Sequence, residues 1–139
     1  MSYEEKGTRV YLVTSAGGYV AYVAVVLSLA SHTPIAHVSY VPVLLWTCVA
    51  SIIASMVGRT LVETARPSDS RRGDVRDREI ARFGEHASRW FVIGGAAAGL
   101  VMAMARLDYF WIANVIYLGF VLWAVAGSVL RILVYRRGL

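Results

Sequence analysis

The chain has 139 residues, of which 58% are hydrophobic and 17% are charged, and its formal net charge is +5. An average soluble domain has fewer apolar and more charged residues, so this composition excludes an ordinary water-soluble globular protein. Uninterrupted apolar stretches of about 20 residues are instead typical of membrane spans. We therefore expect a single transmembrane domain that occupies residues 1–139.

Four apolar stretches are long enough to cross a bilayer. They occupy about residues 11–31, 40–61, 90–107 and 110–134. At ~1.5 Å per residue the first is about 31 Å long, which matches a hydrocarbon core of ~30 Å. Short connections join the first stretch to the second and the third to the fourth. The predicted fold class is therefore all-α: an integral membrane four-helix bundle made of two antiparallel helical hairpins.

The positive charges indicate how the chain crosses the membrane. Lysine and arginine near the ends of spans mark the cytoplasmic side. They are present before the first span, after the last span and throughout residues 62–89, whereas the "HTPIAHV" between the first two spans has none. We therefore expect a multi-pass protein whose two termini and long 62–89 connection all lie in the cytoplasm.

The long connection contains a helical pattern. After Asp74, the apolar residues Ile80, Phe83 and Ala87 share one helical face, and charged residues occupy the remainder. This predicts a cytoplasmic juxtamembrane amphipathic helix that extends the third span, with its apolar stripe on the bilayer surface or against other helices. The helix either sets the topology as a solvated, self-paired segment or docks a cytoplasmic protein. The candidate docking residues are Arg76, Arg78, Arg82, Phe83 and Glu85.

Small residues are concentrated in the first and third spans, as "SAGGY" and "IGGAAAG". In lipid, water-driven burial does not hold helices together, and small residues that permit close approach take over much of that role. The candidate helix-packing residues are Gly17, Gly18, Gly94, Gly95 and Gly99.

The second span carries a polar residue at every fourth position. Small hydroxyls at this spacing pack closely and bond back to the carbonyl four residues earlier. The alternative is that they form one wall of a polar cavity or permeation path. This candidate polar stripe consists of Thr47, Ser51, Ser55, Arg59 and Glu63.

Ionisable groups within spans are the usual pointers to function. Arg59 and Arg131 lie about one turn inside the cytoplasmic boundary, close enough for their long side chains to reach it. We expect Glu63 or another acid at this boundary to pair with one of them, and the candidate ion pair is Glu63–Arg131. Asn114, near the outer side, is expected to bond to a neighbouring helix or to the last connection.

No pattern indicates catalysis. His32 and His37 lie in the outer connection without a carboxylate to complete a metal site, and Cys48 is the lone cysteine. The spans contain no embedded histidine cluster and no paired carboxylates. We therefore expect no catalytic residues, no metal, no cofactor and no enzymatic activity, and we expect no nucleic acid among the partners.

Three segments carry a resemblance to a known group of proteins. The stretches "DVRDREIARFGE", "DYFWIANVIYLGFVL" and "YRRG" resemble small four-span membrane proteins of high-GC Gram-positive bacteria, a group of unknown function. The likeness covers most of the chain and is strongest from Asp74 to Gly138. It implies a bacterial cytoplasmic (inner) membrane and a regulatory or stress context, and it supplies no catalytic residues.

Two functions are compatible with these features. The first is a non-enzymatic inner-membrane protein, a regulatory, immunity-like or accessory subunit, that acts through helix–helix contacts and a cytoplasmic partner; a homo-oligomer stays open. The alternative is a small transporter or channel that uses the polar stripe of the second span. Similar small drug exporters depend on a carboxylate in the first helix, and residues 11–31 contain no acid, which excludes proton coupling by that route.

Overall fold

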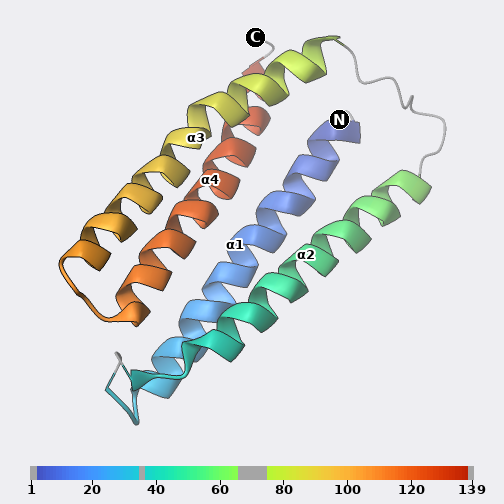
Figure 1. Cartoon of the computed structure of the whole chain (residues 1–139). Helices are drawn as coiled ribbons and strands as arrows, with labels where there is room; N and C mark the ends of the chain where they lie inside the picture. Colours follow the sequence, from blue (N-terminus) through green and yellow to red (C-terminus); the bar gives the residue numbers. More distant parts are fainter. Residues whose placement is uncertain (1–2, 35–36, 66–74, 138–139) are drawn as a thin grey trace.

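The computed structural model describes residues 3–34, 37–65 and 75–137, and within these ranges it contains helices and turns but no strand (Figure 1). The helices are α1 (Tyr3–Ala30), α2 (Tyr40–Ala65), α3 (Val75–Met104) and α4 (Tyr109–Arg137). All four are long and apolar enough to cross a membrane. The predicted all-α four-helix fold is thereby confirmed.

The helices are longer than the apolar stretches that predicted them. Helix α3 has 30 residues, about 45 Å at ~1.5 Å per residue, against a hydrocarbon core of ~30 Å. The amphipathic segment and the third span therefore form one uninterrupted helix, which projects well beyond the apolar layer. The predicted span 90–107 ends too late, because α3 stops at Met104 and a turn follows.

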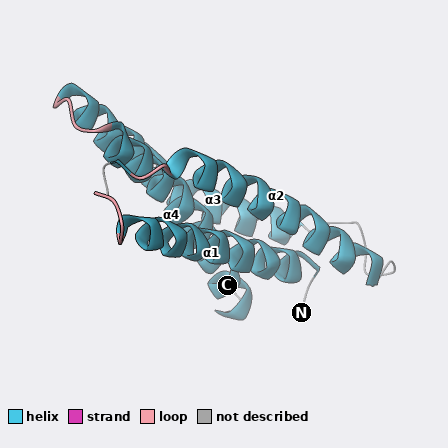
Figure 2. Cartoon of the chain, turned by 90° about the horizontal axis from the view of Figure 1, so that it is seen from below, coloured by secondary structure: helices cyan, strands magenta, loops and turns pink. Residues whose placement is uncertain are grey.

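The helices pack in the order α3–α4–α1–α2. Extensive contacts join α3 to α4, α4 to α1 and α1 to α2, so α1 and α4 are the two central helices (Figures 1 and 2). Helices α1 and α3 begin, and α2 and α4 finish, at the same end of the bundle, the upper end in Figure 1. We call it the arginine end, because Arg59, Arg82 and Arg131 all lie in the turns nearest to it.

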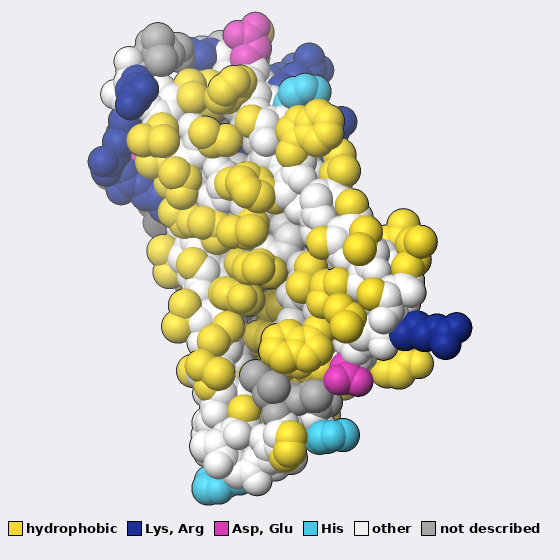
Figure 3. Space-filling model, turned by 90° about the vertical axis from the view of Figure 1, so that its left-hand side faces the viewer, with side chains coloured by type: hydrophobic (Ala, Val, Ile, Leu, Met, Phe, Trp, Pro, Cys, Tyr) yellow, Lys and Arg dark blue, Asp and Glu magenta, His cyan; other side chains and the backbone are white. Residues whose placement is uncertain are grey.

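Most of the surface along the helices is apolar. None of the residues in the most apolar part of α2 is buried inside the chain, and Trp46, Ile52 and Ile53 are all exposed. Figure 3 shows a broad hydrophobic band with most of the visible lysine and arginine gathered at the arginine end. Such a surface is costly in water and is suited to contact with lipid chains.

The end opposite the arginine end is filled by aromatic side chains. Tyr22 is 1% exposed and packs with Val26, Val38 and Phe110 in one buried cluster. The Tyr22 hydroxyl donates to Oδ1 of Asn114 on α4 at 2.7 Å, and the Asn114 amide donates to the Phe110 carbonyl at 2.7 Å. The expected bond from Asn114 to a neighbouring helix is thus confirmed, and it ties α1 to α4.

Helices α3 and α4 are joined by a tight turn. Arg106 adopts a positive φ of 56°. The amide of Arg106 donates to the Ala103 carbonyl at 3.0 Å, and that of Leu107 donates to the Met102 carbonyl at 3.1 Å. This is the Schellman pattern, in which the left-handed position is usually glycine. The turn reverses the chain at once and sets α4 antiparallel against α3.

Candidate functional site

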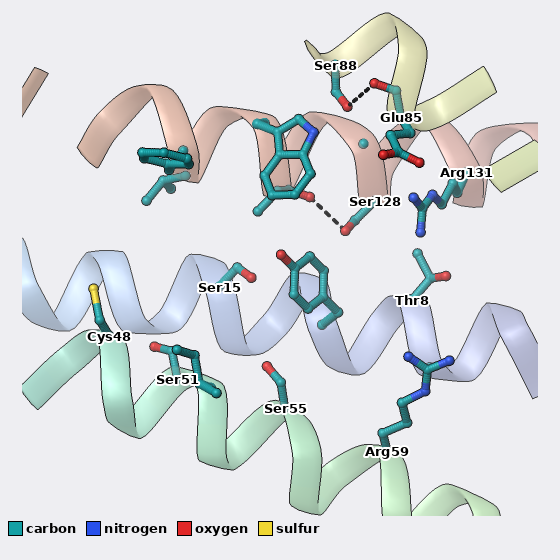
Figure 4. Close-up of a pocket in the computed structure, with 18 of the residues that line it drawn as sticks. Thr8, Ser15, Cys48, Ser51, Ser55, Arg59, Glu85, Ser88, Ser128 and Arg131 are labelled. Atoms are coloured by element: carbon teal, nitrogen blue, oxygen red, sulfur yellow. Dashed lines mark hydrogen bonds between the residues drawn. The ribbon is translucent and has the colours of Figure 1, made fainter. Parts of the chain in front are cut away.

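A cavity of about 700 Å³ lies between α1, α2 and α4. Helix α1 forms its floor with Thr8, Ser15 and neighbouring residues, and α2 and α4 form its two walls (Figure 4). The cavity exists because α2 packs extensively on α1 alone, which leaves a space between α2 and α4. Its volume falls within the range of ~300–1,000 Å³ that is usual for ligand pockets.

Three members of the polar stripe of α2 line this cavity. They are Ser51, Ser55 and Arg59. Thr47 does not line it, and its hydroxyl instead donates to the Val43 carbonyl at 2.8 Å and the Leu44 carbonyl at 3.0 Å. The side chain of Glu63 lies outside the described residues. The stripe therefore combines both interpretations: a back-bonded residue at one end and a cavity wall along the rest.

Hydroxyl groups also join α2 to the floor of the cavity. Ser55 Oγ and Thr14 Oγ1 are hydrogen-bonded at 2.6 Å across the α1–α2 interface. Ser51 lies directly against Gly18, where any larger residue on α1 would collide with its side chain. These contacts fix which face of α2 turns toward the cavity.

The arginine end of the cavity contains three charged groups. Arg59 comes from α2, Arg131 from α4 and Glu85 from α3 (Figure 4). The Nε atom of Arg131 is buried and makes no hydrogen bond. Its side chain lies close against α3: a Cβ atom built on Gly84 would be only 2.8 Å from Arg131 Cγ.

The expected ion pair between Glu63 and Arg131 falls partly outside the described residues, since the Glu63 side chain is not among them. The described acid that shares the cavity with Arg131 is Glu85, and the two form no ion pair. A salt bridge on α1 joins Arg9 to Glu5, at 2.9 Å.

The candidate docking residues do not form a single patch. All five are exposed, with Phe83 at 55%, and Glu85 in addition lines the cavity. Arg78, Arg82, Glu85 and Arg89 follow one helical face at intervals of four, three and four, and Arg76 and Phe83 share another.

Of the predicted apolar stripe of Ile80, Phe83 and Ala87, Ile80 is buried and Phe83 is exposed, so the stripe does not pack against the other helices as a unit. The face that continues from Ile80 against α4 contains Gly84 and Ser88, and Phe83 points away. Small residues decide the packing face here, because they allow close approach that a larger apolar residue prevents.

The candidate packing glycines divide into two groups. A Cβ built on Gly95 would lie 2.9 Å from the Gly119 Cα, and one on Gly99 would lie 2.7 Å from Ile116 Cγ1, so both lie at the α3–α4 interface. Gly18 lies at the α1–α2 interface, as described above. Gly17 and Gly94 have nothing within 4 Å of such an atom and do not pack inside the described chain.

The sequence analysis did not identify the glycines on the face of α4 that packs against α3. Gly119 and Gly127 of α4 lie against Gly95 and Ser88 of α3. Their spacing of eight residues, close to two helical turns, is the signal that places both on one face of α4. Together these residues form a seam of close contact along α3 and α4, which we call the glycine seam.

Among the described residues no three histidine, cysteine, aspartate or glutamate side chains are grouped closely enough to hold a metal ion. Cys48 carries a free thiol and lines the cavity on the α2 side. Comparison with family models, with curated proteins and with solved structures finds no match to this chain.

Proposed function

We propose that this protein acts by binding rather than catalysis, and that the cavity between α1, α2 and α4 holds an amphipathic molecule taken from the bilayer. The observation that carries the proposal is the distribution of groups along the cavity. Charged residues occupy its arginine end, hydroxyls follow along one wall, and apolar and aromatic side chains form much of the remainder. A molecule with one polar and one apolar end matches this order.

The cavity is accessible from the side of the bundle. Ile52 and Phe120 line it, yet they are 60% and 50% exposed. Residues that belong both to a cavity wall and to the lipid-facing surface mark an opening toward the bilayer. An amphipathic ligand therefore enters from lipid without passing through water.

A continuous permeation path receives less support. The polar lining extends from Arg59 only as far as Cys48 on α2, and the cluster around Tyr22 and Phe110 fills the other end of the bundle. A pore needs polar or open lining across the full hydrocarbon layer. The transporter or channel alternative therefore requires the filled end to open.

The proposal is tested by filling the cavity. Ser15→Phe places a large ring on its floor, while Val13→Phe places the same ring on an exposed position of α1. Native mass spectrometry of the full-length protein, titrated with diacyl lipids of several headgroups, measures binding. We expect Ser15→Phe to weaken binding of the best lipid at least tenfold and Val13→Phe to leave it unchanged. Equal binding by both variants would refute the cavity as the binding site.

The proposed location is the cytoplasmic (inner) membrane of a bacterium, with both termini and residues 62–89 in the cytoplasm. The arginine distribution supports this orientation, because six of the positive charges lie in residues 66–82 alone. A reporter enzyme fused at position 70 should be active only in its cytoplasmic form. Activity of a periplasmic reporter at this position would reverse the orientation.

A second candidate function is docking of a cytoplasmic protein on the projecting part of α3. The observation that favours it is Phe83, a large apolar side chain that is 55% exposed and shares a helical face with the exposed Arg76. Aromatic residues and arginines are enriched in protein interfaces. A photo-crosslinker at position 83 should capture one discrete partner in intact cells; capture of lipid alone would argue against docking.

A further inference from the structure

The charges at the arginine end of the cavity are not balanced. Among the described side chains that line this end, two guanidinium groups, from Arg59 and Arg131, accompany one carboxylate, from Glu85, which gives these three a net charge of +1 (Figure 4). The Arg131 Nε is buried without a hydrogen-bond acceptor. This nitrogen lies against Gly84 of α3, so it is the unbalanced positive charge that favours an anion at this end of the cavity.

The depth of the cavity matches one leaflet of a bilayer. From Cys48 to Arg59 its wall on α2 extends about 17 Å, at ~1.5 Å per residue. Half of a hydrocarbon core of ~30 Å is about 15 Å. With the two arginines at the headgroup level, the deepest lining residues therefore lie near the middle of the membrane.

We infer that the ligand is a membrane lipid with a phosphodiester headgroup, whose phosphate is bound by Arg131 and Arg59. This inference rests on the proposed function and specifies the ligand class. Arginine suits this role because its planar guanidinium forms two parallel hydrogen bonds to phosphate oxygens. A phosphodiester carries a single negative charge, which neutralises the net +1. A phosphate monoester carries about −1.5 to −2 at neutral pH and overcompensates it.

The remaining lining accommodates the rest of such a lipid. The hydroxyls of Ser15, Ser55 and Ser128 follow the arginines into the cavity. Ser55 is bonded to Thr14 and Ser128 donates to the Ala124 carbonyl, so Ser15 is the one of the three placed to donate to a glycerol or ester oxygen. Ile52 and Phe120 lie along the open side, where acyl chains leave the cavity for the bilayer. The cavity therefore binds the headgroup and the first part of the chains.

The test compares lipids that share their acyl chains. Full-length protein in detergent is titrated with dioleoyl phosphatidylglycerol and with dioleoylglycerol, which lacks the phosphate, and binding is measured by native mass spectrometry. We expect the wild type to prefer the phospholipid at least tenfold. Arg131→Gln should remove this preference, and Arg59→Gln, at a more exposed position, should reduce it in a chain whose fold is less disturbed. Arg106→Gln, in the turn at the opposite end, is the control and should keep the preference intact.

Each other outcome identifies which idea fails. Equal binding of the two lipids by the wild type overturns the phosphate inference and leaves the binding function standing. Absence of binding to either lipid overturns the proposed function itself. Soluble glycerophosphate that displaces the phospholipid at equal concentration overturns the lipid as the source of the phosphate. A preference retained in both arginine variants overturns the assignment of the arginines.

Discussion

The two hairpins of this bundle are held together differently. Between α3 and α4 the backbones approach so closely that Gly95 and Gly119 leave no room for a Cβ atom. Between α1 and α2 the contacts include a hydroxyl pair, Thr14 with Ser55, and the outer helix α2 has no buried residue in its most apolar part. The α3–α4 hairpin is a close-packed unit, whereas α1–α2 is one side of a cavity.

This difference explains how a small membrane protein can maintain a cavity without a large buried core. Since apolar burial provides no net driving force in lipid, stability depends on close approach and on hydrogen bonds between helices. The glycine seam supplies the first and the bond from Tyr22 to Asn114 supplies the second. With these in place, α2 is free to stand away from α4.

The largest expected effect comes from breaking the glycine seam. In Gly95→Ala the new methyl group would lie 2.9 Å from the Gly119 Cα, so the two backbones must separate. Overpacking of this kind costs about 1–3 kcal/mol. Thermal stability in detergent, followed by the size-exclusion peak of the folded protein, measures the loss. Gly94→Ala, whose methyl meets nothing within 4 Å, is the matched control and should lose no stability. Equal stability of the two variants would contradict the seam.

An intermediate effect is expected where the hairpins join. Tyr22→Phe removes the hydroxyl that donates to Asn114 at 2.7 Å, and leaves the Asn114 oxygen without this donor. Hydrogen bonds between membrane helices contribute about 0.6 kcal/mol on average and up to about 1.7. The same assay applies. Tyr19→Phe keeps an equivalent ring contact with Tyr117 and serves as control. An equal or larger loss in Tyr19→Phe would contradict the specific contribution of the bond from Tyr22 to Asn114.

The smallest effect is expected between α1 and α2. Thr14→Val removes the bond to Ser55 at 2.6 Å together with the back-bonds to Val10 and Tyr11. Thr60→Val removes only a back-bond, to Met56 at 2.9 Å. The difference between the two variants reports the interhelical bond together with the second back-bond of Thr14, and we expect it to be about 0.6 kcal/mol. No measurable difference would mean that the small residues around Gly18 hold this interface without the hydroxyl pair.

Much of the fold is predictable from the sequence because each span satisfies its own backbone hydrogen bonds. A helix that crosses lipid needs only length and apolarity, and both are local properties. The polar stripe is local as well, because its spacing of four residues places Ser51, Ser55 and Arg59 on one face of α2 whatever the neighbouring helices are. The helix that this face contacts is not determined by the spacing within α2.

The packing face and the cavity depend on more than one helix. Gly94 and Gly95 are adjacent in sequence, yet only Gly95 meets α4, because the position of α4 decides which of them is used. Glu85 looks like a solvent-facing residue of an amphipathic helix, and only the approach of α3 to Arg131 brings it to the cavity. A cavity whose lining comes from four helices has no signature in any one of them.

The continuous length of α3 has a mechanical consequence. Gly84 and Ser88 of α3 pack closely against Arg131 and Gly127 of α4 at the arginine end. Gly95 packs closely against Gly119 deeper in the bundle. Helix α4 forms a wall of the cavity and also packs closely against α3. A tilt of α4 should therefore move the first turns of α3 with it. We therefore expect the α3–α4 hairpin to move as one rigid unit, in which α4 borders the cavity and the first turns of α3 lie outside the apolar layer.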